Sequence, residues 1–587
     1  MNIKDFHISS KMENVSLDLA IFEESDTYIV LKFQMKAEEK IVPSEVKIEW
    51  TVPVDNVLSV WTPLGSFTRF IQPNWRRTKS ESKTAVGAPV LSLVNHDGTN
   101  ACTIAISDPK TPTEVGAGAS EEDAVFYCNV KFFTAYISPI DFYEAYIRID
   151  FENLPFTDSV RGVNQWWETA FGYEKADVPS DAYLPMDSAW YSFHQALDPE
   201  ELIEECRRSS ALGMKTIIID DGWQTDDNNR GYSYCGDWKL ATGKIPSMKA
   251  LTEEIHKLGM KVMLWYSVPF VGIYSKAYER FKDMALTSDK NGDVLVVDIR
   301  YKEVRDYLVD TYVNAVRDFD LDGLKLDFID RFRLTADSPA VNDRMDIPSV
   351  EDALEALLCE AKAELVKLRP DILLEFRQSY MGPTVLKYGN MIRVRDCPYD
   401  SMRNRTHIID LRLTSGKTAV HSDMIMWNKY APTETAARQL ISTLFGVPQV
   451  SVRLIDMPRE HCEAIRFWLD FYTKNIDVLH SEDMKVKNPE MGYSQVVTRK
   501  GGSLIGVNYA NVPFDIERLS DDGAHYTLIN SSDAPYVCVS AREDMGDCSV
   551  RIFDCVGRLL KDVSINICAG ALMLDVPVCG FAEISAK

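Results

Sequence analysis

Short runs in which apolar and polar residues alternate dominate both ends of the chain. Near the N-terminus such runs lie at 27–33, 45–50, 124–130 and 143–149. A period of two, with turn residues between the runs, is typical of antiparallel strands that bury one face. The same pattern returns in runs at 526–529, 550–553 and 571–574. We therefore predict an N-terminal antiparallel β-sandwich over 1–165 and a small C-terminal antiparallel β domain over 484–587.

The middle of the chain, residues 166–483, has a different pattern. Apolar strand-like runs alternate there with segments of helical periodicity. The sequence Leu-Gly-Met-Lys occurs at 212–215 and again at 258–261, each time between a helical pattern and an apolar run. Glycine is a common stop signal at the end of a helix. This alternation predicts βα units around a parallel sheet.

Eight candidate strands can be counted in the middle region, at 188–193, 216–220, 262–265, 323–327, 372–377, 391–395, 418–421 and 449–453. They span roughly 270 residues, close to the length of about 250 that is typical of a (β/α)8 barrel. The alternative is a doubly wound open sheet, but the sequence lacks the G-x-G-x-x-G loop of that fold. We predict a (β/α)8 TIM barrel over 166–483.

Composition narrows the class of protein and of partner. The chain has 587 residues, 45% hydrophobic and 26% charged, which suits a folded multidomain protein. A net charge of −24 argues against a nucleic-acid partner. No apolar run has the length of a signal peptide or a membrane span, and the twelve cysteines show no C-x-x-C pair. We expect no membrane partner, no disulfide or zinc framework, and a bacterial-type cytoplasmic location.

One predicted strand carries two charges on the same face. In Gly-Leu-Lys-Leu-Asp at 323–327, Lys325 and Asp327 alternate with two leucines, so both charged side chains point into the barrel mouth. A nearby cation lowers the pKa of a carboxyl group, and an ionised, oriented carboxylate is what a nucleophile requires. The alternative is a helix cap or a structural ion pair.

A second strand ends in two adjacent carboxylates, Asp220 and Asp221, followed by Gly222 and Trp223. Buried carboxylates require hydrogen-bond donors, and the hydroxyl groups of a sugar would supply them. Trp223 or Trp265 would stack on the apolar face of the sugar ring. The alternative is a plain Asp-Gly turn. No histidine joins the pair, so we expect no metal.

A third carboxylate, Asp396, ends the sixth predicted strand. It lies two barrel positions from Asp327, so the two carboxyl groups could face each other across a pocket. Asp400 and Asp330 are competing candidates. Asp400 lies further along the loop, and an ion pair with Arg331 explains Asp330 better.

The order and spacing of these residues resemble the melibiase-type α-galactosidases of glycoside hydrolase family 36 and its clan. The resemblance covers about 180–480 and rests on segments at 220–223, 236–238, 244–246, 255–265, 325–327 and 396. It implies an N-terminal β-sandwich, a barrel and a C-terminal β domain. It also implies a nucleophile at Asp327, a general acid/base at Asp396, a charge partner at Lys325, and ligands of the sugar O4 and O6 at Asp220 and Asp221. The implied mechanism is a retaining double displacement without a cofactor, with carboxyl groups about 5–5.5 Å apart.

Two segments depart from the family pattern. A glycine-rich loop usually follows the fifth strand, where this chain has Glu375, Phe376 and Arg377. A Trp-x-Ser motif usually precedes the acid/base, where this chain has Arg393 and Arg395. The three arginines could bind a carboxylate, sulfate or phosphate on a modified sugar. Alternatively, they form a structural network with Glu375.

We therefore expect a retaining exo-acting α-glycosidase, first of all an α-galactosidase, that cleaves terminal α-linked galactose or a galactose-like sugar from oligosaccharides. The alternatives are an α-galactosyltransferase of the raffinose-synthase kind, and an α-N-acetylgalactosaminidase or anionic-sugar glycosidase. A non-catalytic carbohydrate-binding protein is a third class, against which the presence of both Asp327 and Asp396 argues. The sequence is also compatible with a homo-oligomer.

Overall fold

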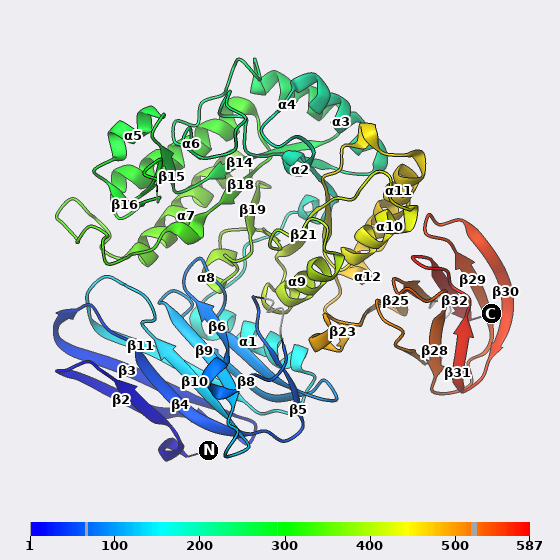
Figure 1. Ribbon diagram of the computed structural model, residues 1–587, viewed down its shortest axis with the longest axis horizontal. Coiled ribbons are helices and arrows are strands. Elements are labelled where there is room, and N and C mark those ends of the chain that lie inside the picture. The colour runs from blue at the N-terminus through cyan, green and yellow to red at the C-terminus, as the bar shows by residue number, and fades with distance from the viewer. Residues whose placement is uncertain (1, 65–68, 290, 518–524, 587) are drawn as a thin grey trace.

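The computed structural model describes residues 2–64, 69–289, 291–517 and 525–586. Its N-terminal part is a sandwich of two antiparallel sheets, at the lower left of Figure 1. One sheet has the strand order β1-β4-β10-β9-β6 and the other β2-β3-β11-β8-β7-β5. The strands are β1 His7–Ser10, β2 Val15–Glu24, β3 Tyr28–Ile41, β4 Val46–Pro53, β5 Val57–Trp61, β6 Thr78–Ser82, β7 Val90–Asn95, β8 Asn100–Ile106, β9 Thr113–Ala119, β10 Val125–Phe132 and β11 Ile140–Asp150. Phe33 and Phe132, one from each sheet, stack with ring centroids 4.7 Å apart in the shared core. The predicted sandwich is confirmed.

The central part is a closed barrel of eight parallel strands, as predicted. Its order is β12 Met186–Ser188, β13 Thr216–Ile219, β14 Lys261–Ser267, β18 Gly323–Asp327, β19 Leu373–Arg377, β20 Met391–Arg393, β21 Ala419–Ile425 and β22 Val447–Val450. The prediction of a strand at 188–193 was wrong for most of its length, because residues after Ser188 form a helical turn. There the backbone N–H of Tyr191 donates to Ser451 Oγ at 3.0 Å, a tertiary contact that overrides the β propensity of an aromatic run.

Helices surround the barrel. They are α1 Phe156–Phe171, α2 Ala189–Phe193, α3 Pro199–Leu212, α4 Met248–Lys257, α5 Lys276–Phe281, α6 Lys302–Phe319, α7 Val350–Leu368, α8 Pro383–Leu386, α9 Ser401–Thr414, α10 Thr433–Ser442, α11 Arg459–Lys474 and α12 Ile476–Leu479. Asp198 caps α3 by accepting from the backbone of Glu200 and Glu201, and Gly213 ends it at φ 108°. Among the described helices, none is long and apolar enough to cross a lipid bilayer.

A small sheet, unexpected from the sequence, follows β14. It has the order β15 Phe270–Gly272, β17 Val294–Val297 and β16 Ala285–Ser288. The C-terminal part, at the right of Figure 1, has a seven-stranded sheet of order β23-β24-β25-β27-β32-β29-β30 and a three-stranded sheet of order β26-β28-β31. These strands are β23 Met484–Lys487, β24 Gln495–Lys500, β25 Ser503–Asn508, β26 Phe514–Ile516, β27 His525–Asn530, β28 Val537–Ala541, β29 Gly546–Phe553, β30 Leu559–Ile567, β31 Gly570–Leu574 and β32 Phe581–Ala586. The predicted β domain is confirmed, although the pairs β25–β27 and β26–β28 are parallel.

A buried polar cluster joins all three parts of the chain. Asp410 of α9 accepts hydrogen bonds from Trp61 Nε1 at 2.9 Å and from Tyr493 Oη at 2.5 Å, and it forms an ion pair with Arg69. Arg69 Nη1 also donates to Tyr493 Oη at 2.9 Å. The side chains of Arg69 and Asp410 are 3% and 0% exposed. This cluster fixes the sandwich and the C-terminal part against the barrel.

Candidate active site

A complete layer of polar and aromatic side chains lies inside the barrel, toward the carboxyl ends of its strands. The layer beneath it is apolar and contains Met186, Ile218, Met263, Leu373, Met391, Ala419 and Val447. Two residues further along each strand the inward side chains are Ser188, Asp220, Trp265, Lys325, Glu375, Arg393, His421 and Gln449, all buried. Residues two apart in a strand share a face. The interior of the barrel therefore changes from apolar to charged within one step, at the end where barrel enzymes place their chemistry.

Lys325 pairs with a different carboxylate from the one nearest in sequence. Its Nζ lies 2.5 Å from Asp220 Oδ2, and the two side chains are 5% and 4% exposed. The other oxygen of Asp220 accepts the backbone N–H of Asp221 at 2.9 Å. Lys325 thus lies between Asp220, which it contacts, and Asp327, on which its charge also acts.

Asp327 is the most heavily hydrogen-bonded of the predicted catalytic residues. Its Oδ1 accepts from Arg377 Nε at 2.7 Å, from the backbone N–H of Phe328 at 2.7 Å, and from the hydroxyl of Tyr380. Its Oδ2 accepts from Trp265 Nε1 at 3.1 Å. Burial opposes ionisation, but these donors and the nearby positive charges outweigh it and hold the pKa of Asp327 well below its usual range. Asp327 is therefore an ionised, oriented carboxylate.

Asp396 lies beyond the end of β20 and its side chain is 56% exposed. The buried Arg393 donates from Nη2 to Asp396 Oδ1 at 2.8 Å and pairs through Nη1 with Asp423. The second oxygen of Asp423 accepts the backbone N–H of Cys397 at 2.5 Å. Partial burial works against ionisation of Asp396, but the charges of Arg393 and Arg377 keep its pKa below the usual value. Arg393 thus connects an exposed carboxylate at the mouth, Asp396, to a buried one behind it, Asp423.

Asp221 is held by two side-chain amides. Gln195 Nε2 donates to Oδ2 at 2.8 Å and Gln224 Nε2 donates to Oδ1 at 2.6 Å. Burial raises the pKa of Asp221 to about 6. Its neighbour Asp220 is ion-paired instead, so the adjacent carboxylates differ in their partners and in their electrostatic environment.

The prediction that Trp223 stacks on a sugar is wrong. Its indole is 0% exposed, and Nε1 donates to the backbone carbonyl of Trp265 at 2.9 Å. The ring packs against Tyr266 and Trp238 at centroid distances of 5.3 and 6.1 Å. Tyr266 points away from the barrel interior, between the inward residues Trp265 and Ser267, so Trp223 belongs to the packing outside the barrel. Trp265 does reach the site, where it is a hydrogen-bond donor to Asp327.

Three residues in or near the polar layer make contacts that their place in the sequence does not indicate. Tyr380, which follows β19 in an unusual segment, carries no motif but contacts Asp327 directly. His421 is near Asp423 in sequence, yet its Nε2 contacts the carbonyl of Ala182 at 2.8 Å, so the two residues form no proton relay. Asp400, a candidate catalytic carboxylate, is the N-cap of α9.

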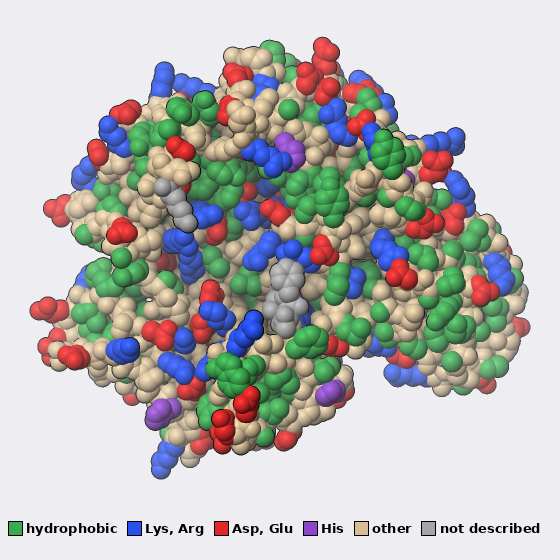
Figure 2. All heavy atoms as spheres, in the orientation of Figure 1, with side chains coloured by type: hydrophobic (Ala, Val, Ile, Leu, Met, Phe, Trp, Pro, Cys, Tyr) green, Lys and Arg blue, Asp and Glu red, His purple; other side chains and the backbone are tan. Residues whose placement is uncertain are grey.

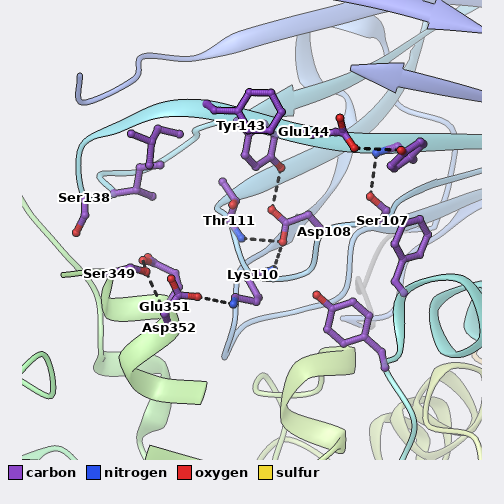
Figure 3. Close-up of a pocket in the computed structure, with 16 residues that line it drawn as sticks. Ser107, Asp108, Lys110, Thr111, Ser138, Tyr143, Glu144, Ser349, Glu351 and Asp352 are labelled. Atoms are coloured by element: carbon purple, nitrogen blue, oxygen red, sulfur yellow. Dashed lines mark hydrogen bonds and ion pairs between the residues drawn. The ribbon is translucent and has the colours of Figure 1, made fainter. Parts of the chain in front are cut away.

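A cavity of about 620 Å³ lies where the sandwich meets α7, and none of the predicted site residues lines it. Figure 3 shows how its polar groups pair with one another. Tyr143 Oη donates to Asp108 Oδ2 at 2.9 Å, and Lys110 Nζ lies 2.5 Å from Asp352 Oδ1. Because these charges already have partners, the cavity is a polar seam between two parts of the chain.

Part of this chain matches the model of a known protein family. The family model described as Melibiase matches residues 186–396. The match begins with the first barrel strand and ends at Asp396, so it includes Asp220, Lys325 and Asp327. Residues 186–396, which hold six of the eight barrel strands, are therefore similar to a melibiase domain. The match covers less than half of the 587 residues.

The proteins to which this chain is similar in sequence include α-galactosidases. The α-galactosidase AgaA of Geobacillus stearothermophilus is 26% identical over 135 residues, which is 22% of this chain and 18% of that protein. The bifunctional α-galactosidase/sucrose kinase AgaSK of Mediterraneibacter gnavus is 27% identical over 200 residues, 32% of this chain and 20% of that protein. The alignments thus span about a fifth of these relatives' length.

The whole chain also has the fold of a solved structure, a GH36 α-galactosidase from Geobacillus stearothermophilus in complex with raffinose. The TM-score is 0.62, the sequence identity is 13%, and the likeness covers 98% of this chain and 81% of that one. The two chains therefore share a fold.

Proposed function

We propose that this chain is a retaining exo-acting α-glycosidase that removes terminal α-linked galactose, or a galactose-like sugar, from oligosaccharides. The observation that carries the proposal is Asp327, a buried carboxylate at the end of a barrel strand that Arg377 and Lys325 hold in its ionised form. A carboxylate nucleophile must be ionised and fixed in direction. The α-galactosidase relatives, and the raffinose bound to a structural neighbour, support galactose as the sugar.

The hydrogen bonds of Asp327 indicate which of its oxygens attacks. Oδ1 accepts from three donors, whereas Oδ2 accepts only from Trp265 in the described structure. Since a carboxylate oxygen has two lone pairs, Oδ2 keeps one for the anomeric carbon. In the proposed first step, a bond forms between Oδ2 and the anomeric carbon while the bond from that carbon to the glycosidic oxygen breaks.

Asp396 is the proposed general acid/base. It gives its proton to the leaving oxygen in the first step and takes a proton from the attacking water in the second, which releases Asp327. In the free chain the charges of Arg393 and Arg377 favour its ionised form. A bound sugar would cover its exposed side and exclude water, which raises the pKa of a carboxyl group. We therefore expect Asp396 to become an acid only in the complex.

Asp220 and Asp221 are the proposed ligands of the sugar O4 and O6 hydroxyl groups. Both carboxylates are buried, yet their oxygens have acceptor capacity beyond the donors they already engage. A cytoplasmic location is also a proposal. It is supported by free cysteines such as Cys128, which lie in the strand core of the sandwich as small apolar groups and suit a reducing compartment.

The test is hydrolysis of a panel of 4-nitrophenyl α-glycosides: galactoside, N-acetylgalactosaminide, glucoside, galacturonide and L-arabinopyranoside. The wild type should cleave the galactoside fastest. Asp327→Asn should lower the rate at least about a thousand-fold, as loss of a nucleophile does elsewhere. Asp337→Asn, the same change at an exposed loop position, is the matched control. The proposal fails if Asp327→Asn retains turnover, or if NMR shows that the sugar is first released as the β-anomer.

A further inference from the structure

Three arginines lie at the mouth of the barrel, and one of them has no partner for its side chain among the residues that the structure describes. Arg377 pairs with Asp327, and Arg393 pairs with both Asp396 and Asp423. The guanidinium of Arg395 makes no hydrogen bond or ion pair within residues 2–64, 69–289, 291–517 and 525–586. Of the three arginines that could bind an anionic group, only Arg395 is therefore free to do so within the described part of the chain.

Arg395 is positioned beside the proposed catalytic carboxylates. It directly precedes Asp396, and its backbone N–H donates to Gln378 Oε1 at 3.2 Å, which ties the loop after β20 to the loop after β19. Its side chain is half-buried. Burial first, and then the positive charges of Arg403 and Arg377, lower the pKa of Arg395, whereas the charges of Asp396 and Asp330 act in the opposite direction. In Figure 2, Lys and Arg side chains gather near the centre of the face shown, where barrel and sandwich adjoin.

An unpartnered, half-buried arginine stands out against three others in this chain. Arg69, Arg300 and Arg305 are each buried and each paired with an aspartate. Removing a cation from water without a partner costs free energy, and a bound anion would recover it. The planar guanidinium fits a carboxylate, sulfate or phosphate through two parallel hydrogen bonds.

We propose that Arg395 binds a carboxylate, sulfate or phosphate group of the substrate, so that this site favours an anionic glycoside over its neutral counterpart. This inference rests on the proposed glycosidase function. The anionic group lies either on the sugar that is removed or on the leaving group, since Arg395 adjoins Asp396, which must reach the oxygen between them.

Two substrate pairs separate these sources. The first compares 4-nitrophenyl α-galacturonide with the α-galactoside, and the second compares 4-carboxyphenyl α-galactoside with the 4-carbamoylphenyl compound. For the favoured pair, the anionic-to-neutral ratio of kcat/KM should exceed one in the wild type. It should fall at least about ten-fold in Arg395→Gln, mainly through KM, as loss of a charged hydrogen bond predicts. Arg395→Lys should restore part of the lost preference. The control is Arg317→Gln, which makes the same change in charge at an exposed position of α6 and should keep the wild-type ratio.

The inference is overturned if the wild type favours the neutral member of both pairs, or if Arg395→Gln leaves both ratios unchanged. If the wild type cleaves no glycoside of either charge, the proposed function has failed instead. Binding then decides the role of Arg395: galacturonate should raise the Tm of the wild type more than galactose does, and this difference should vanish in Arg395→Gln. The 4-carboxyphenyl and 4-carbamoylphenyl α-galactosides give the same comparison for the leaving group, and equal Tm shifts within both pairs in the wild type would refute the role of Arg395.

Discussion

Replacing Asp410 with asparagine should destabilise the whole chain, although Asp410 lies outside the proposed site. The side chain of Asp410 is 0% exposed and accepts from three residues. Trp61 and Arg69 belong to the sandwich, and Tyr493 belongs to the C-terminal part. Asparagine has almost the same shape but no charge. The substitution therefore leaves the buried guanidinium of Arg69 without a counter-charge while it keeps the packing.

The expected loss is about 3–5 kcal/mol, the usual cost of breaking a buried ion pair by removing one partner. The structure points to this range because Arg69 is only 3% exposed, so water cannot solvate it in place of the carboxylate. Among the described residues, its remaining side-chain hydrogen bond is with Tyr493 Oη at 2.9 Å, a neutral group. Replacing both charges, as in Arg69→Met with Asp410→Asn, removes the uncompensated cation and keeps an amide oxygen that can accept from Trp61 and Tyr493, so it should cost less, about 1–3 kcal/mol for the one unsatisfied amide donor.

Urea unfolding followed by tryptophan fluorescence and circular dichroism measures these differences. Four proteins are needed: the wild type, Asp410→Asn, the double variant, and Asp337→Asn as an exposed control that should stay within about 0.5 kcal/mol of the wild type. If Asp410→Asn costs less than about 1 kcal/mol, or if the double variant is less stable than Asp410→Asn, then the uncompensated charge of Arg69 is not the cause.

Two further predictions concern the site. Tyr380→Phe should lower kcat/KM for the 4-nitrophenyl galactoside about 10- to 100-fold, the value of one hydrogen bond to a charged acceptor, because it removes a donor from Asp327 Oδ1. Tyr388→Phe, which removes a hydroxyl from Glu355 elsewhere in the barrel, should leave the rate within about two-fold, and an equal effect of both changes would contradict a specific role for Tyr380. Because burial raises the pKa of Asp221 to about 6, its ionised form is lost as the pH falls from 7 to 5, so KM should rise over that interval. Asp221→Asn should have a raised KM that no longer changes there, and a persisting change in KM would assign the titration to another group.

The sequence alone predicts those features of the site that depend on neighbouring residues in one strand. Lys325 and Asp327 fall on one face of β18 because alternation is a local property of a strand. The apolar-to-charged step at strand ends could be read in the same way, since each polar residue follows an apolar one by two positions. The observed limits of β18, Gly323–Asp327, are also the predicted ones.

Features that depend on contacts between distant segments could not be predicted. The sequence gives no sign that Lys325 contacts Asp220, which lies 105 residues away, in preference to Asp327. Nor does it show that the loop after β13 turns Trp223 away from the barrel interior. Tyr380 was equally hidden, since a single tyrosine in a loop is recognisable as a ligand of Asp327 only when β18 and β19 are paired.

Two cations at the mouth each act on one proposed catalytic carboxylate and on one other carboxylate. Lys325 contacts Asp220 while it acts on Asp327, and Arg393 contacts Asp423 as well as Asp396. Each of these two cations therefore keeps a partner when a catalytic carboxylate is neutralised.

Arg377 is different, because its carboxylate contact in the described structure is Asp327 alone. In the proposed mechanism Asp327 loses its charge when it becomes an ester, at the same step in which Asp396 gives up its proton and becomes charged. The charge of Arg377 acts on both carboxyl groups and lowers the pKa of Asp396. The negative charge near Arg377 is thus moved from one carboxylate to the other, and Arg377 keeps a nearby negative charge in the glycosyl-enzyme. In the free chain the charge of Arg377 lowers the pKa of Asp396. In the glycosyl-enzyme the same charge stabilises Asp396 in its ionised form.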